Sequence, residues 1–239
     1  MTPVRLAMWS GPRNLSTAML RAWENREDTV VVDEPLYAAY LARTGLDHPG
    51  RDAVIASQPT DVEEAVRALQ APLPAGVRVH YAKHMSHHLL DDDDLAWTSG
   101  FRNVLLIRDP AEVVASYVRS RRSCEPADIG LLQQVRLLDS WGETPPVIDA
   151  GDFLRDPEGH LRWLCDWLGV GYTPRMLTWP AGPRASDGVW ARHWYDSVWR
   201  STGFEAWRPR EVRLSHHDSA VAEACRPAYD RLHGLRLRL

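Results

Sequence analysis

Short apolar runs alternate with amphipathic stretches through the first two thirds of the chain, and this alternation limits the fold more than any other feature. Apolar and β-branched runs predict strands at residues 4–9, 29–32, 77–82, 103–107 and 146–149. Helical periodicity predicts helices at 16–26, 35–42, 61–69, 110–122, 131–141 and 157–168. Because strands that alternate with helices form right-handed βαβ units, the sequence predicts an α/β fold with a central, mostly parallel sheet flanked by helices.

The last quarter of the chain has a different character. Residues 172–210 are rich in Trp, Pro, Gly and Arg and have little periodicity, which indicates an irregular segment folded over the sheet. A final helix is predicted at 215–234, with a kink or a break at Pro227. We therefore expect one domain, 1–239, with the tail at 172–239 packed on it.

Charge and hydropathy exclude several classes of partner. The formal net charge is −4, so a broad basic face for nucleic acid is not expected. No apolar run approaches the roughly 20 residues that span a bilayer, and the first residues lack the apolar core of a secretion signal. The three cysteines are far apart and form no CxxC pair. These features predict a cytoplasmic protein with reduced thiols and no membrane partner.

Polar residues follow each of the predicted strands. In an open parallel sheet, ligands bind beyond the carboxyl ends of the strands, which share one edge. The residues expected at that edge are the loop 10–17, Asp33 with Glu34, Lys83 with His84, Arg108 with Asp109, and Asp149. Such a gathering of polar groups has no structural purpose of its own and predicts a ligand site.

The loop Ser-Gly-Pro-Arg-Asn-Leu-Ser-Thr at 10–17 leads from the first strand into a helix. Backbone N–H groups at a helix start favour an anion, and Arg13, Ser16 and Thr17 offer further donors. An ordinary Ser-capped helix is equally compatible with this loop alone. The loop is not a Walker A sequence, since Leu15 and Ser16 stand where that motif has Gly and Lys. A metal-dependent nucleotide hydrolase is therefore disfavoured.

Other strand ends supply chemically distinct groups. Arg108 has no structural reason to end an apolar strand, and Ser116 lies about two helical turns beyond it, on the same face. Lys83 is the one lysine beside 27 arginines, which suggests a need for a compact ammonium group. Glu34 could act as a general base, or simply as an acid near a helix start. Although His84, His87 and His88 lie close together, no HExxH motif is present and no metal is expected.

Taken together, residues 10–17 and the run Ile-Arg-Asp-Pro-Ala-Glu-Val-Val-Ala-Ser-Tyr at 107–117 resemble two motifs of sulfotransferases. These enzymes use 3′-phosphoadenosine 5′-phosphosulfate (PAPS), and the resemblance covers roughly residues 4–170. It implies a P-loop-like fold of three layers. By position it also implies that the 5′-phosphosulfate is bound by Arg13, Asn14, Ser16 and Thr17, and the 3′-phosphate by Arg108 and Ser116.

The resemblance further implies catalytic roles for Glu34 and Lys83. The general base stays open between Glu34 and His84, because the histidine here is adjacent to Lys83 rather than two residues on. Residues 182–190 resemble a late loop that closes over the nucleotide, which suggests Arg184 and Gly188 as contacts. Tyr37 is a candidate for the acceptor pocket.

The implied activity is transfer of a sulfuryl group from PAPS to a hydroxyl or amine of a small molecule, by in-line displacement. Two alternatives stay open: a small-molecule kinase with a P-loop, and a non-catalytic nucleotide-binding protein on the same fold. The sequence carries no signal for the identity of the acceptor or for the oligomeric state.

Overall fold

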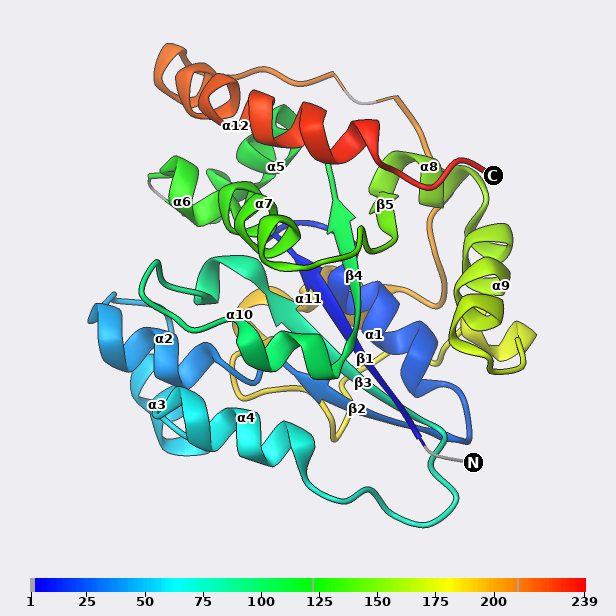
Figure 1. Cartoon of the computed structure of the whole chain (residues 1–239). Helices are drawn as coiled ribbons and strands as arrows, with labels where there is room; N and C mark the ends of the chain where they lie inside the picture. Colours follow the sequence, from blue (N-terminus) through cyan, green and yellow to red (C-terminus); the bar gives the residue numbers. More distant parts are fainter. Residues whose placement is uncertain (1–2, 122, 210) are drawn as a thin grey trace.

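The computed structural model describes residues 3–121, 123–209 and 211–239. A parallel five-stranded sheet lies at its centre (Figure 1). The strand order is β2-β3-β1-β4-β5, and every neighbouring pair is parallel. The strands are β1 (Val4–Ser10), β2 (Thr29–Asp33), β3 (Val79–Met85), β4 (Arg102–Ile107) and β5 (Val147–Asp149). The predicted α/β fold with a parallel sheet is confirmed.

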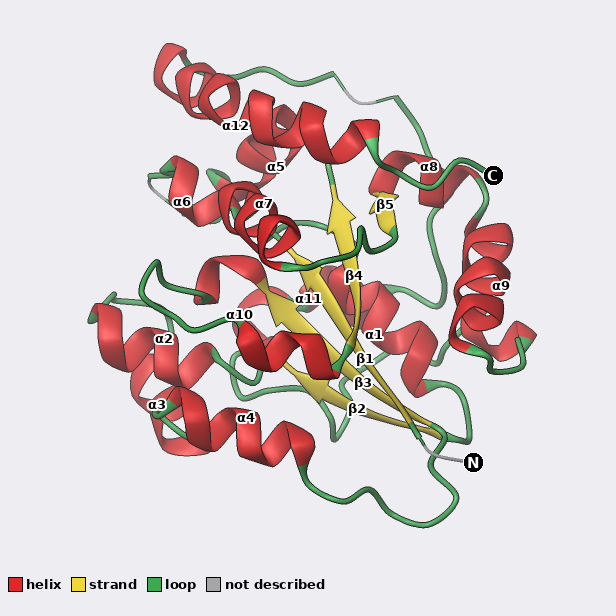
Figure 2. Cartoon of the chain, in the orientation of Figure 1, coloured by secondary structure: helices red, strands yellow, loops and turns green. Residues whose placement is uncertain are grey.

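Helices cover both faces of this sheet (Figure 2). Those that follow the first four strands are α1 (Ser16–Glu24), α2 (Tyr37–Thr44), α3 (Arg51–Ser57), α4 (Val62–Gln70) and α5 (Pro110–Tyr117). The later ones are α6 (Pro126–Ile129), α7 (Leu131–Ser140), α8 (Ala150–Arg155), α9 (Pro157–Leu168), α10 (Ala191–Trp194), α11 (Asp196–Arg200) and α12 (His216–Gly234). Short 3₁₀ turns lie at Ser86–His88, Ala96–Gly100 and Pro174–Leu177.

The alternation of side chains along β1 divides the core into two layers. Leu6 and Met8 point to the face covered by α1 and α9, where they pack with residues such as Leu20 and Leu164. Ala7 and Trp9 point to the opposite face, which α4, α5, α7 and α12 cover. Each fully buried large apolar side chain contributes about 1.5–3 kcal/mol to folding. A parallel sheet is stable here because both faces are covered.

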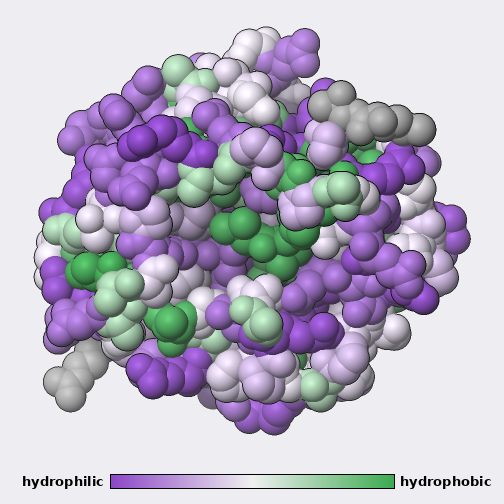
Figure 3. All heavy atoms as spheres, turned by 90° about the horizontal axis from the view of Figure 1, so that it is seen from below, coloured by the Kyte–Doolittle hydropathy of each residue, from purple (hydrophilic) through white to green (hydrophobic). Residues whose placement is uncertain are grey.

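The tail contributes to the core instead of standing apart from it. Met176 and Trp179 join the layer of α1 and α9, whereas Trp190 and Tyr195 pack with α2 in a third cluster. In the described residues, no helix is long and apolar enough to cross a membrane. Seen from below, the surface is mostly hydrophilic with a hydrophobic group near its centre (Figure 3).

Several predicted boundaries differ from the structure, and one difference matters for the site. β3 continues to Met85 instead of ending at residue 82, because it pairs with β1 as far as Ser10 and Met85. α3 forms in a stretch for which no helix was predicted, and α12 runs through Pro227 as one helix. α5 ends at Tyr117, and the predicted end at Arg122 lies outside the described residues.

Candidate functional site

A cavity of about 1240 Å³ opens at the carboxyl edge of the sheet. Its walls come from the loop before α1, the ends of β2 and β3, the β4–α5 junction and the tail. Nine of the predicted site residues line it: Arg13, Asn14, Ser16, Thr17, Glu34, Tyr37, Lys83, Arg108 and Ser116. The structure thus brings most of the predicted residues to one site, although three others lie elsewhere.

The loop before α1 is shaped to leave the helix start free. Leu15 occupies the N-cap position, and no side chain caps the first N–H groups of α1. Asn14 fixes the loop from within, because its amide donates to the carbonyl of Leu106 (3.0 Å) and its oxygen accepts from the N–H of Leu15 (2.8 Å). A Cβ on Gly11 would lie 2.0 Å from the carbonyl oxygen of Ile129, so only glycine fits there. The uncapped N–H groups face the cavity as an anion site.

Arg13 and Arg108 bring positive charge to this loop. The Nε of Arg13 donates to Ser116 Oγ (3.0 Å), and a guanidinium N–H of Arg108 donates to the carbonyl of Arg13 (3.0 Å). Arg108 also forms an ion pair with Glu112 (2.6 Å). Burial lowers the pKa of Arg13, and the charges of Arg119 and Arg108 add to this effect. A second anion beside these groups would relieve their mutual repulsion.

Two residues with unusual backbone angles, Arg13 (φ 54°) and Glu34 (φ 44°), line the cavity. Among the described residues, they are the non-glycine residues with positive φ. A side chain in this region costs about 1–3 kcal/mol and persists where surrounding contacts hold it. The strain therefore falls on residues that the sequence already assigned to the site.

Lys83 is held in a buried group of acidic and phenolic side chains. Its Nζ donates to Asp33 Oδ1 (2.9 Å), Glu34 Oε1 (2.6 Å) and the hydroxyl of Tyr195, and the Lys83 side chain is only 1% exposed. Asp33 lies directly opposite Lys83 in the β2–β3 pairing, so the sheet register brings them together. All three protons of the ammonium group are therefore used within the protein.

The charges of this group are unbalanced, since two carboxylates share one ammonium. Burial raises the pKa of Glu34 and outweighs the lowering effect of Lys83, and Asp33 raises it further. Burial opposes the charge on Lys83, but Asp33 and Glu34 raise the pKa of Lys83 above its ordinary value. Glu34 Oε2 is turned away from Lys83, 4.0 Å from His88 Nε2. A carboxylate with a raised pKa and a free oxygen is suited to accept a proton.

Tyr195 is a site residue that the sequence did not reveal. Its hydroxyl donates to the Asp33 carboxylate (2.7 Å) and accepts from Trp190 Nε1 (3.1 Å) and from Lys83. Burial and the charges of Asp33 and Glu34 raise the pKa of Tyr195 well above its usual value, so it stays a neutral phenol. The Trp-rich composition of the tail was the one signal available, and it does not distinguish Tyr195 from its neighbours.

His84 lies outside the cavity. Because β3 continues past residue 82, Lys83 and His84 are successive strand residues and point to opposite faces of the sheet. His84 stacks on Trp9 with ring centres 4.1 Å apart, and burial lowers its pKa to about 3. The structure therefore does not place His84 where a general base would act.

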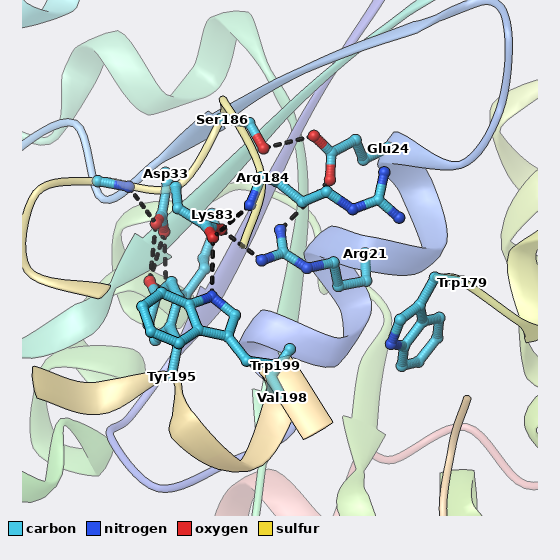
Figure 4. Close-up of polar contacts among 12 residues, drawn as sticks. Arg21, Glu24, Asp33, Lys83, Trp179, Arg184, Ser186, Tyr195, Val198 and Trp199 are labelled. Carbon is cyan, nitrogen blue, oxygen red and sulfur yellow. Dashed lines mark hydrogen bonds and ion pairs between the residues drawn. The ribbon is translucent and has the colours of Figure 1, made fainter. Parts of the chain in front are cut away.

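Arg184 and Gly188 also lie outside the cavity walls. The N–H of Arg184 donates to Asp187, which pairs with Arg21 of α1, and the N–H of Gly188 donates to Asp33 Oδ2 (3.3 Å). Figure 4 shows this segment lying between α1 and the Lys83 group. The backbone N–H groups of Arg184 and Gly188 therefore help to hold the tail to α1 and β2.

Aromatic and imidazole rings form the wall beyond Glu34. Tyr37 stacks on His88 (4.6 Å between ring centres), and its hydroxyl bonds His48 Nδ1 (2.8 Å). Burial lowers the pKa of His48 to about 4 and that of His87 to about 3, so both are neutral near pH 7. This wall therefore consists of planar rings that offer hydrogen-bonding groups, and its histidines His48 and His87 carry no charge near pH 7.

One group of described residues has metal-ligand spacing, namely Asp149, Asp152 and His233. Asp149 already caps α8 and accepts from Tyr229, and Asp152 already pairs with Arg236 (2.8 Å). These contacts account for the carboxylates within the protein.

Comparison with known proteins identifies related chains. A family model described as a sulfotransferase domain matches residues 4–235. Two Arabidopsis thaliana proteins, branched-chain-amino-acid aminotransferase-like proteins 1 and 2, are 38% identical over 235 residues and 36% identical over 227 residues. These matches cover 95% and 93% of this chain but 41% and 40% of the two proteins. The chain thus spans about two fifths of the length of these relatives.

Solved structures share the fold. The sulfotransferase domain from the curacin biosynthetic pathway aligns with a TM-score of 0.57 at 17% identity, covering 93% of this chain and 97% of that one. The sulfotransferase from Alicyclobacillus acidocaldarius aligns with a TM-score of 0.56 at 15% identity, covering 100% and 98%. The P-loop-like sulfotransferase fold implied by the motifs is confirmed.

Replacing Lys83 by Met is expected to destabilise the protein by about 3–5 kcal/mol near neutral pH, because two buried carboxylates lose their counter-ion. The pKa of folded Glu34 then moves further above its unfolded value of about 4.3. The free energy of unfolding of the variant is therefore close to that of the original protein below about pH 4.3, and it falls as the pH rises above this value. Urea unfolding at about pH 5 and pH 8 measures this difference.

An Arg67→Met variant on the exposed face of α4 serves as the control and should change little at either pH. Equal destabilisation of Lys83→Met at both pH values would contradict the account, since it would indicate lost packing rather than lost charge.

Proposed function

The chain belongs to the sulfotransferase domain family, and we propose that it transfers a sulfuryl group from PAPS to a hydroxyl or amine of a small molecule. One observation carries the proposal: an uncapped helix start with Arg13 and a buried carboxylate–lysine group share one cavity. The first suits an activated phosphosulfate and the second suits proton removal from an acceptor. A cavity of about 1240 Å³ has room for both substrates.

The residues of the donor side fit PAPS in their chemistry. The N–H groups at the start of α1, with Arg13, Ser16 and Thr17, would hold the 5′-phosphosulfate. Arg108 and Ser116 would hold the 3′-phosphate. Arg13 donates a hydrogen bond to Ser116 and so links the two phosphate sites. PAPS supplies a sulfuryl group activated by its bond to phosphate. Because this group carries less charge than a transferred phosphoryl, positive side chains can suffice without a metal ion.

On the acceptor side, we assign Glu34 as the general base. Its Oε2 would take the proton of the acceptor hydroxyl or amine while the acceptor forms a bond to sulfur. The bond between sulfur and the phosphate oxygen breaks, and the electron pair leaves with the phosphate. Arg13 stabilises the charge that develops on that phosphate. The raised pKa of Glu34 favours this role, because a more basic carboxylate accepts a proton more readily.

Lys83 has a coupled part in this scheme. In the free protein, the ammonium group of Lys83 donates its three hydrogen bonds to Asp33, Glu34 and Tyr195. When Glu34 accepts a proton, its pair with Lys83 loses most of its Coulomb attraction. The ammonium charge then becomes available to the leaving phosphate at the moment when that charge develops. Asp33 and Tyr195 keep Lys83 in place throughout.

Other activities fit these residues less well. A P-loop kinase would use a lysine in the phosphate loop, whereas the one lysine of this chain lies in β3 among carboxylates. The relatives are named aminotransferase-like, and pyridoxal-dependent aminotransfer needs a lysine amine to form a Schiff base. The raised pKa of Lys83 keeps it protonated, which disfavours that chemistry in this segment. A purely nucleotide-binding protein would have no use for the strained, buried Glu34.

The protein is expected to bind the product nucleotide 3′-phosphoadenosine 5′-phosphate without added metal, and Arg108→Ala should weaken binding about 10- to 100-fold. The loss corresponds to about 1.5–3 kcal/mol for hydrogen bonds to a charged group. Titration calorimetry measures both affinities. Arg102→Ala, at the opposite end of the same strand, is the matched control and should bind normally.

A preference for ATP with magnesium would contradict the proposal and favour the kinase alternative. Tight nucleotide binding without turnover over a broad acceptor panel would instead favour a non-catalytic binder.

Glu34→Gln should lower the rate of sulfuryl transfer by about 10²–10⁴-fold, because the amide cannot accept the acceptor proton. The measurement is release of 3′-phosphoadenosine 5′-phosphate from PAPS in the presence of hydroxylated and amine acceptors. Affinity for the product nucleotide should stay within about threefold of the original, since Glu34 contacts the acceptor side. Glu63→Gln on α4 is the control. Full activity of Glu34→Gln would place the base elsewhere.

A further inference from the structure

Arg121 stands in the wall of the cavity on the side assigned to the acceptor. It follows α5 and lies over the ring of Trp194, with its Cζ 5.2 Å from the ring centre. Both residues line the cavity together with Glu34 and Tyr37. We infer that Arg121 binds a carboxylate of the acceptor. The second substrate is then a molecule that carries a carboxylate together with the hydroxyl or amine that accepts the sulfuryl group. This inference rests on the proposed function, because it names the acceptor class of the same site.

Within residues 3–121, 123–209 and 211–239, the guanidinium of Arg121 forms no ion pair with an acidic residue and lies over the Trp194 ring. Two other arginines of this region have acidic partners, Arg108 with Glu112 and Arg21 with Asp187. The chain has 32 acidic residues against 28 Lys and Arg, so a shortage of acids does not explain this. A partly buried guanidinium without a counter-ion is suited to a planar oxyanion from outside, which it can bind with two parallel hydrogen bonds.

The charge of Arg121 acts on the acceptor side of the cavity. Burial is the main cause of the low pKa of His48 and of His87, and Arg121 lowers both further. On the donor side the corresponding neighbour is Arg119, whose charge lowers the pKa of Arg13 after burial. Arg119 and Arg121, which both follow α5, therefore act on different groups of the cavity.

The surroundings of Arg121 add neutral hydrogen-bonding groups and flat walls. His87 lines the cavity, and its buried Nδ1 has no hydrogen-bond partner among the described residues. Tyr37, stacked on His88, and Trp194 offer aromatic faces. A planar acceptor with its carboxylate toward Arg121 and its hydroxyl toward Glu34 fits these walls. We therefore expect aromatic hydroxy acids to be better ligands than their neutral analogues.

The test uses titration calorimetry of the full chain, alone and saturated with 3′-phosphoadenosine 5′-phosphate. The probes are 3- and 4-hydroxybenzoate, the matched hydroxybenzamides, and phenyl phosphate. The carboxylates should bind about 10- to 100-fold more tightly than the amides, and Arg121→Gln should remove this preference. Affinity of the variant for the nucleotide should not change. Arg192→Gln, on the exposed face of α10, is the matched control and should keep the preference.

The inference is overturned if amides bind as well as carboxylates, if none of the carboxylates binds, or if Arg121→Gln keeps the preference. Tighter binding of phenyl phosphate than of either hydroxybenzoate would overturn the assignment to a carboxylate. Failure of the nucleotide to bind would instead contradict the proposed function. The carboxylate preference measured in the nucleotide-free protein then still decides the role of Arg121, so the two failures are distinguishable.

Discussion

The sharing of one ammonium by two adjacent buried carboxylates is the interaction on which the site depends. Asp33 ends β2, Glu34 follows it, and Lys83 lies opposite Asp33 in β3, so the register of two parallel strands fixes the group. Burying three such charges is costly unless each is paired and hydrogen-bonded. Burial, and to a smaller extent the charge of Asp33, raises the pKa of Glu34 and leaves it as the group best able to take up a proton.

The tail makes this arrangement possible and links it to the phosphate loop. Tyr195 gives Asp33 a hydrogen bond and receives one from Lys83, which satisfies polar atoms that the strands alone would leave open. The segment at 184–188 pairs with Arg21 of α1 and donates to Asp33. The helix that carries the loop at its start is thus tied to the carboxylate group through the tail. A displacement of the tail would therefore disturb contacts on both the donor side and the acceptor side of the cavity.

The sequence predicted the sheet, the loop and most of the site, because strand ends in a parallel sheet converge whatever the details of packing. It misplaced His84, because β3 pairs with β1 as far as Met85 and so extends beyond the predicted end at residue 82. His84 is therefore a strand residue and points to the face of the sheet opposite Lys83. Arg184 and Gly188 were assigned by likeness, and in the structure their backbone N–H groups bond to Asp187 and Asp33 outside the cavity walls. Tyr195 was missed because its contacts are with residues distant in the chain, which no local spacing encodes, and the same holds for the contact of Arg121 with Trp194.

The most direct test of the account is a crystal structure of the protein with 3′-phosphoadenosine 5′-phosphate. The account predicts the 5′-phosphate at the start of α1, within hydrogen-bonding distance of Arg13 and Thr17, and the 3′-phosphate at Arg108 and Ser116. Glu34 should face the 5′-phosphate across the space left for an acceptor. A nucleotide bound away from α1, or one whose phosphates leave Glu34 and Lys83 on the far side of the adenine, would contradict it.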